Sequence, residues 1–176
     1  MKVDTPGSII SDVNIITLAR GPARVVNTYP AYMVNGYRFH TKSHSTTRAT
    51  DCSGVCVLRK TFGNEEEDYY GGLDEIIELN YIAPTVKQAF IFNCSWFDTT
   101  HRGGTRIHPQ MKVVDVNKNR KMLTKDKYIF AHQASQVYFL EYPTARRIDT
   151  DWMAVCKFKS RMLSLTIFHP DMTLLV

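Results

Sequence analysis

Apolar and polar residues alternate along much of the chain in short runs that are separated by Gly, Pro, Asn and Asp. Such alternation is typical of half-buried β-strands, and the separating residues are those that form turns. Because the runs recur about every ten residues, they leave little room for the crossovers of a parallel sheet. We therefore expect a mainly β fold, a small antiparallel barrel or sandwich of about seven to eight strands with one or two short helices. The predicted strands cover residues 37–41, 54–59, 72–81, 88–97, 111–117, 128–131, 136–141 and 152–159, and a short helix is predicted at 12–19.

The segment DYYGGLDEIIELNY, residues 68–81, fits a helix and a strand almost equally well. A helix is disfavoured because two glycines precede the apolar stripe and an asparagine interrupts it. A strand places Leu73, Ile77, Leu79 and Tyr81 on one face, with Glu75 out of phase. We predict a strand with a β-bulge near Glu75, because a bulge shifts the alternation by one residue.

The next run, KQAFIFNCSWFD, alternates without interruption and puts Phe90, Phe92, Cys94 and Trp96 on one apolar face. That face is predicted to lie on the core. Because IAPTV with Pro84 reads as a turn, we expect the two runs to pair as an antiparallel hairpin.

Length and charge are compatible with many classes of globular protein. The chain has 176 residues and a formal net charge of +5, which suits one globular domain and permits contact with polyanions without requiring it. We expect no export signal and no membrane-spanning helix, since no apolar run approaches ~18 residues. Cysteines 52, 56, 94 and 156 are therefore expected to be reduced, in a nuclear or cytoplasmic protein.

Metal and catalytic motifs are sparse. Cys52 and Cys56, with His40 and His44, have ligand-like spacing, but on one extended segment the two cysteines would lie about 13 Å apart, too far to share an ion. We expect no metal, no cofactor and no catalytic residue, hence no enzyme. The remote alternative is a divalent-metal nuclease that would use Asp115 with Asp98 or Asp151.

Two sets of residues are candidates for binding. Five aromatic residues flank predicted strand ends, where their rings could converge on a cation such as methyl-lysine, with Glu65 to Asp68 attracting a basic tail. They are Tyr69, Tyr70, Trp96, Phe97 and Tyr128. A basic run could contact phosphates, and comprises Lys112, Lys118, Arg120, Lys121, Lys125 and Lys127. The competing interpretations are core packing for the aromatic residues and a solvated loop for the basic ones.

Several phrases occur together in a characteristic order: LARGPARVVNTYPAYMVNGYRFHTK, SGVCVL, DYYGGLDEIIELNY, FIFNCSWFD, VNKNR, HQASQVYFLEYP and WMAVCKFKSR. Together they resemble the domain of unknown function in the C-terminal part of proteins encoded by plant CACTA (En/Spm-type) transposons. The resemblance covers residues 18–161, with 1–17 as an N-terminal extension and 162–176 as a tail. It implies a plant, transposon-derived protein and no known activity.

The sequence departs from that family's pattern around residues 108–132, which puts a shared binding surface there in question. The order of strand motifs also resembles bromo-adjacent homology domains, which are β-barrels of chromatin proteins. In that resemblance the hairpin of 72–81 and 88–97 is central, with Ile77, Leu79, Phe90, Phe92 and Cys94 as packing residues. These resemblances predict a non-enzymatic domain that binds a protein partner, with a histone tail as the candidate ligand. The alternative is a nucleic-acid-binding module that uses residues 112–127.

Overall fold

The structure is a computed structural model that describes residues 13–46, 51–60, 66–82, 87–123, 126–143, 151–157 and 159–160. Strands dominate these residues, which confirms the mainly β prediction. The strands are β1 (Asn27–Tyr29), β2 (Ala31–Val34), β3 (Tyr37–His40), β4 (Gly54–Lys60), β5 (Glu66–Tyr81), β6 (Lys87–Trp96), β7 (Thr105–Ile107), β8 (Val114–Asn117), β9 (Tyr128–Phe130), β10 (Ser135–Glu141) and β11 (Trp152–Lys157). The helices are α1 (Val13–Arg20), α2 (Lys42–Ser45) and the 3-10 helix η1 (Ala131–Gln133).

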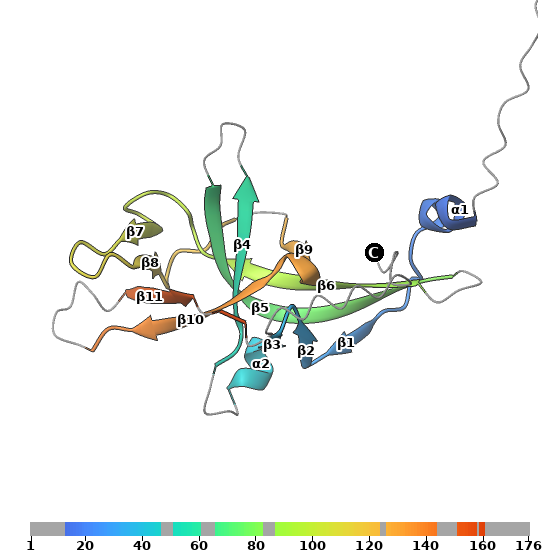
Figure 1. Ribbon diagram of the computed structural model, residues 1–176, viewed down its shortest axis with the longest axis horizontal. Coiled ribbons are helices and arrows are strands. Elements are labelled where there is room, and N and C mark those ends of the chain that lie inside the picture. The colour runs from blue at the N-terminus through green and yellow to red at the C-terminus, as the bar shows by residue number, and fades with distance from the viewer. Residues whose placement is uncertain are drawn as a thin grey trace, which may run out of the picture.

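Nine strands form one antiparallel sheet that curls into a half-barrel (Figure 1). Its order is β7-β8-β11-β10-β4-β5-β6-β9, with β1 paired to β5 beside β4. Strands β2 and β3 form a separate hairpin, whose turn contains Asn35 (φ 52°) and Gly36 (φ 74°). Two successive residues with positive φ are what a type I′ turn requires, and Asn-Gly is the pair that adopts it most readily.

The hairpin of β5 and β6 is the longest feature of the sheet and reaches well beyond the other strands (Figure 1). Its register shifts between Leu73 and Glu75, which confirms the predicted bulge. The bulge brings Leu73 and Ile76 to the same face, and both are fully buried. The prediction that Ile77 and Leu79 share that face was wrong, because the extra residue reverses the alternation; these two side chains are half-buried.

Two hydrophobic clusters hold the sheet together. The first contains Phe39, Val55, Leu73, Ile76, Phe92, Cys94, Trp96, Ala131 and Ala134. The second contains Cys56, Tyr70, Phe97, Val116, Val137 and Val155. Because Val55 and Cys56 are neighbours on β4, the two clusters lie on opposite faces of that strand. The predicted core face of β6 is confirmed, since Phe92, Cys94 and Trp96 are buried and Phe90 packs against them.

Some predicted boundaries differ from the observed ones. Strand β8 begins at Val114 rather than at residue 111, because Lys112 has φ 56° and its N–H donates to the carbonyl of His108, closing a turn. Strand β5 begins at Glu66, earlier than expected. Residue 131 was predicted to end a strand and instead starts η1. The predicted Pro84 turn lies outside the described residues.

Helix α1 matches the predicted helix and lies near the far end of the β5–β6 hairpin (Figure 1). The following segment attaches it there, because Pro22 forms a bridge with Tyr81 and the N–H of Ala23 donates to the carbonyl of Asn80. The helix crosses the proposed boundary between residues 17 and 18. Within the described ranges, no helix has the length and apolar character needed to cross a bilayer.

Candidate functional site

The five aromatic residues predicted to form a binding rim do not lie on one surface. Trp96 is 5% exposed and belongs to the first cluster, against which Tyr69 packs. Tyr70 and Phe97 are buried in the second cluster. Tyr128 is 57% exposed, on β9. Packing therefore explains four of the five residues, and their rings cannot enclose a shared ligand across the two faces of a sheet.

Tyr70 is further held by polar contacts beside the acidic segment. Its hydroxyl donates to Oδ2 of Asp68 at 3.0 Å, and the same carboxylate forms an ion pair with Lys157. Burial, followed by the charge of Asp68, raises the pKa of Tyr70. Asp68 is thus engaged within the fold, while Glu65 lies outside the described residues.

The basic run is distributed over several local contacts. Lys118 Nζ lies 3.0 Å from Glu141 Oε1, and Arg120 lies 4.0 Å from Asp98. Lys121 Nζ sits 3.2 Å from the centre of the Phe97 ring, and burial lowers its pKa to about 8. Lys112 and Lys127 are exposed, and Lys125 lies outside the described residues. Of the five described members, Lys118, Arg120 and Lys121 thus lie against groups of the fold, and Lys121 and Lys127 line one pocket together with Trp96.

The nuclease alternative depended on Asp115, and this carboxylate already has partners. Its Oδ2 accepts from Arg106 Nε at 3.0 Å, and its Oδ1 accepts from the Tyr142 hydroxyl at 2.6 Å. Asp98 instead accepts from Thr100, and Asp151 from Asn119. Each of these three carboxylates thus has a hydrogen-bond partner within the fold.

The four residues with zinc-ligand spacing occupy different environments. Cys56 is buried in β4, whereas Cys52 precedes that strand and is half-exposed. The rings of His40 and His44 meet edge to face, with 5.1 Å between their centres. Among the residues that the structure describes, no three His, Cys, Asp or Glu side chains lie where they could hold a metal ion together.

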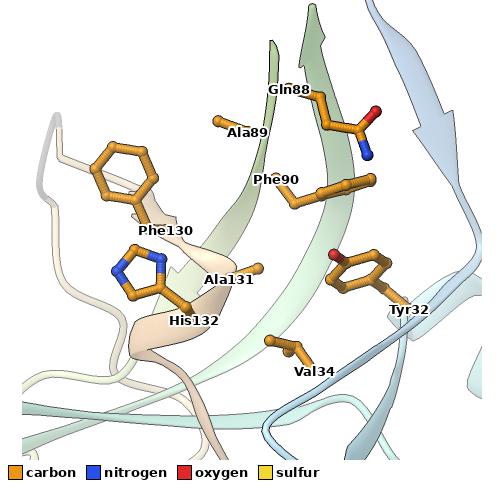
Figure 2. Close-up of a pocket in the computed structure, with 8 residues that line it drawn as sticks. All are labelled: Tyr32, Val34, Gln88, Ala89, Phe90, Phe130, Ala131 and His132. Atoms are coloured by element: carbon orange, nitrogen blue, oxygen red, sulfur yellow. The ribbon is translucent and has the colours of Figure 1, made fainter. Parts of the chain in front are cut away.

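A cleft that no local sequence pattern predicts lies beside strand β6. It has a volume of about 160 Å³, and Figure 2 shows its lining. One wall carries Tyr32 and Phe90, the other Phe130 and His132, and Ala131 lies between them. The complete lining is Tyr32, Val34, Gln88, Ala89, Phe90, Phe130, Ala131 and His132, which we call the aromatic cleft.

Each wall of the aromatic cleft is a stacked pair of rings. The centres of Tyr32 and Phe90 are 4.2 Å apart with 23° between the planes, and those of Phe130 and His132 are 5.5 Å apart, also at 23°. Tyr32 also meets Phe92 edge to face, which fixes its ring against the buried core. By contrast, Phe130 is 43% exposed. The cleft thus has one rigid wall and one wall open to solvent.

The β2–β3 turn ties the two walls together. Asn35 Nδ2 donates to the carbonyl of His132 at 2.7 Å, so the turn that follows β2 is fastened to η1. The Asn-Gly pair in YMVNGYRFH is the sequence signal for this hairpin, and the strand predicted at 37–41 covers only its second strand. No local pattern signals the contact between residues 35 and 132.

The aromatic cleft lies at a strand edge rather than on a sheet face. Three consecutive residues of β6, from Gln88 to Phe90, line it. Neighbouring side chains on a strand point to opposite faces, so only a cleft beside the edge can touch all three. Strand β9 pairs with β6 only at residues 91–93 and then turns into η1. Among the described residues, no strand continues β9 alongside Lys87–Phe90.

A carboxylate lies close to the rigid wall. Glu78 is the cross-strand partner of Phe90, so their side chains share a face. The Glu78 carboxylate accepts hydrogen bonds from Tyr29 and Asn27. These bonds lower the pKa of Glu78, the one from Tyr29 more than the one from Asn27. The pKa of Tyr32 is raised by burial and then by the charge of Glu78. The cleft is therefore aromatic at its surface with negative charge nearby.

Comparison with known protein families finds a match to part of the chain. A domain of unknown function (DUF4216) is found at residues 77–155, just under half of the chain. This match begins within β5 and ends within β11, so it includes Gln88 to Phe90 and the whole of η1. The comparisons with curated proteins and with solved structures returned no match.

Proposed function

We propose that this protein is a non-enzymatic interaction domain, which binds an extended segment of a protein partner at the aromatic cleft. The observation that carries the proposal is the position of the cleft: two stacked aromatic pairs flank a β6 edge that β9 leaves uncovered. An exposed edge offers backbone groups to an added strand, and pockets beside it select side chains. Proteins ordinarily cover or blunt such edges, so an open one beside a built cleft favours a binding role.

The side chain that enters the cleft is either apolar or cationic. Aromatic faces attract ammonium and guanidinium groups, and Glu78 behind Phe90 adds negative potential. A lysine-containing segment such as a histone tail is therefore the finer form of the proposal. In this form of the proposal the residues that contact the ligand are Tyr32, Phe90, Phe130 and His132. They take the place of the buried or packed Tyr69, Tyr70, Trp96 and Phe97.

The biological setting is also a proposal. The phrases described above suggest descent from a plant CACTA transposon protein, and the match to a domain of unknown function at residues 77–155 is compatible with that origin. A domesticated transposon protein that binds chromatin would act in the nucleus. Terminal inverted repeats flanking the gene, or their remnants, would support this descent. If neither this gene nor its relatives in related genomes carry such repeats, the descent is contradicted.

The experiment that tests the function compares two exposed aromatic residues on one strand. Phe130 lines the cleft, whereas Tyr128, two residues earlier on β9, does not. Peptides are selected from a random library and a histone-peptide array with the wild-type domain. Phe130→Ala should weaken binding at least about tenfold, because aromatic anchors dominate such interfaces, while Tyr128→Ala should not. Equal losses, or no selective peptide, would contradict the proposal.

The same domain and variants are also tested for binding to nucleic acid. Binding of duplex DNA or single-stranded RNA through residues 112–127 would weaken steeply as salt rises and would be lost on charge reversal at Lys118 and Arg120. We expect no such behaviour, because both groups lie beside carboxylates of the fold.

A further inference from the structure

A second pocket lies at the outer edge of β6, beside the segment that joins β8 to β9. The N–H of Met122 donates to the carbonyl of Trp96 at 2.9 Å, and the N–H of Cys94 donates to the carbonyl of Lys127, also at 2.9 Å. These two bonds hold the segment against β6. The pocket has a volume of about 350 Å³, and its lining includes Trp96, Lys121, Met122 and Lys127. We call it the lysine pocket.

The charged side chains of the described lining are both cations. They belong to Lys121 and Lys127, and neither forms an ion pair within the part of the chain that the structure describes. The carboxylate that acts on Lys121 is Asp74, which already accepts from Lys42 Nζ at 2.8 Å and from the Ser95 hydroxyl. The lysine pocket therefore carries positive charge that the described residues do not neutralise.

Lys121 is partly removed from water without a full replacement for it. Its Nζ lies 3.2 Å from the centre of the buried Phe97 ring. Burial, followed by the charge of Lys42, lowers the pKa of Lys121 to about 8 from an ordinary value of 10.5. A ring face attracts an ammonium group but does not accept hydrogen bonds as a carboxylate or phosphate oxygen does. An anion in the pocket would supply that acceptor and the missing countercharge.

Apolar surface adjoins the two ammonium groups. Leu123 is fully exposed and Met122 is half-buried, and both line the lysine pocket beside the buried Trp96. The volume of about 350 Å³ lies within the range of small-molecule sites, roughly 300–1,000 Å³. The pocket therefore suits a ligand that combines an anionic group with an apolar body of modest size.

A nucleic acid fits this arrangement less well. Phosphate-driven binding of DNA typically uses several basic contacts, roughly six to ten in a strong complex. The nearby Lys118 and Arg120 lie beside Glu141 and Asp98 instead of facing the pocket. The charge available at the pocket is thus suited to one anionic group.

We propose that the lysine pocket binds a small organic anion, whose carboxylate or phosphate group contacts Lys121 and Lys127 and whose apolar body covers Met122 and Leu123. This site is separate from the aromatic cleft. Strand β9 pairs with β6 at residues 91–93, between the part of β6 that lines the cleft and the part that lines the lysine pocket. The inference does not depend on the proposed function.

Two compounds with the same apolar body test the need for charge. Hydrocinnamate carries a carboxylate, and hydrocinnamamide is its uncharged counterpart. In a titration of the isotope-labelled chain, hydrocinnamate should shift the amides of Trp96 and Met122 saturably and bind at least about tenfold more tightly than the amide, because hydrogen bonds between ions are the stronger ones. Phenyl phosphate, titrated in parallel, shows which anionic group is preferred.

Substitutions assign the binding to the two lysines. Lys121→Met keeps the length and the apolar stem of the side chain over Phe97 but removes the charge, and it should weaken hydrocinnamate binding at least about tenfold. Lys127→Met, at an exposed position where folding is not at risk, should do the same. Lys112→Met removes the same charge from an exposed residue outside the pocket and should change the affinity by less than about twofold.

The pH dependence gives an independent measurement. Binding to the wild type should weaken as the pH rises from about 7 to about 9.5, because Lys121 loses its proton over this range. Lys121→Met should remove this decline.

Equal affinities for hydrocinnamate and hydrocinnamamide, or equal effects of Lys127→Met and Lys112→Met, would overturn the inference. The same holds if neither anion gives saturable shifts below about 10 mM. Binding of single-stranded DNA through Lys121 and Lys127, with no binding of either small anion, would also overturn it and favour a nucleic-acid site. Tighter binding of phenyl phosphate with the same dependence on Lys121 and Lys127 would support it and assign the ligand group as a phosphate.

Discussion

Arg106 holds the fully buried carboxylate of Asp115, with Nε 3.0 Å from Oδ2. The guanidinium also lies over the ring of Trp152, 4.1 Å from its centre, and the Tyr142 hydroxyl donates to the other carboxylate oxygen. These contacts join β7, β8 and β11 with the segment after β10. The residue that a nuclease would have used is thus committed to holding one end of the sheet together.

Asp115→Asn should therefore act on stability. Neutralising one member of a buried pair leaves the Arg106 charge without its partner, and such changes cost about 3–5 kcal/mol of the free energy of unfolding. Chemical denaturation measures the loss. The control is Asp151→Asn on the exposed turn before β11, which should cost less than about 0.5 kcal/mol. A loss below about 1 kcal/mol for Asp115→Asn, with reduced magnesium binding, would revive the metal site.

The close pairing of β4 and β10 requires a glycine at position 54. A Cβ atom at Gly54 would lie 2.1 Å from the carbonyl oxygen of Val137, which is backbone and cannot rotate away. Gly54→Ala should lower the free energy of unfolding by at least about 2 kcal/mol through overpacking. At Gly103 the nearest obstacle is the mobile end of the Arg120 side chain, 2.7 Å away, so Gly103→Ala should cost below about 1 kcal/mol. Similar losses for both variants would show that the strands can separate here.

The bulge in β5 gives two neighbouring isoleucines different degrees of burial. Ile76 is fully buried in the first cluster, whereas Ile77 is half-buried. Ile76→Ala should cost about 2–5 kcal/mol and Ile77→Ala distinctly less, because the lost contacts and the cavity left scale with burial. Thermal and urea unfolding of the two variants, measured side by side, test the register. The reverse ranking would mean that the alternation runs uninterrupted from Leu73.

The cysteines should differ in reactivity. Cys56 and Cys94 are buried, and Cys52 and Cys156 are half-exposed. Burial, then the charge of Asp68, raises the pKa of Cys56 to about 12 from an ordinary value of 9.0. Alkylation of the native protein at pH 8, read by mass spectrometry, should label Cys52 and Cys156 first and reach the buried pair only after denaturation. Rapid native labelling of Cys94 would contradict the packing of β6.

The same shift predicts an alkaline decline in stability. The folded state binds the Cys56 proton more tightly than the unfolded state, so this contribution is complete below about pH 9 and is lost as the pH rises towards about 12. Cys56→Ala should flatten the decline of the denaturation midpoint in that window. An unchanged pH profile would assign the decline to other groups.

Local patterns account for the strands better than for the site. Period-two alternation identified the long β5–β6 hairpin, its bulge and the core face of β6, because each depends on residues close in sequence. Strands β1, β2 and β7 contain only three or four residues each, too few for alternation to stand out. The aromatic cleft joins Tyr32, Phe90 and Phe130, which no local pattern relates. The predicted aromatic rim does not form because Tyr69 and Tyr70 are neighbours on one strand, and neighbouring side chains on a strand point to opposite faces.

Chemical-shift mapping with a selected peptide tests the central claim most directly. Titration of an isotope-labelled domain should perturb the amides of Gln88, Phe90 and His132 while leaving those of residues 112–121 unchanged. Saturable shifts at the aromatic cleft that disappear in Phe130→Ala and persist in Tyr128→Ala are the predicted result. Shifts confined to the basic residues, or centred on Tyr70 and Phe97, would contradict the assignment of the binding site to the edge of β6.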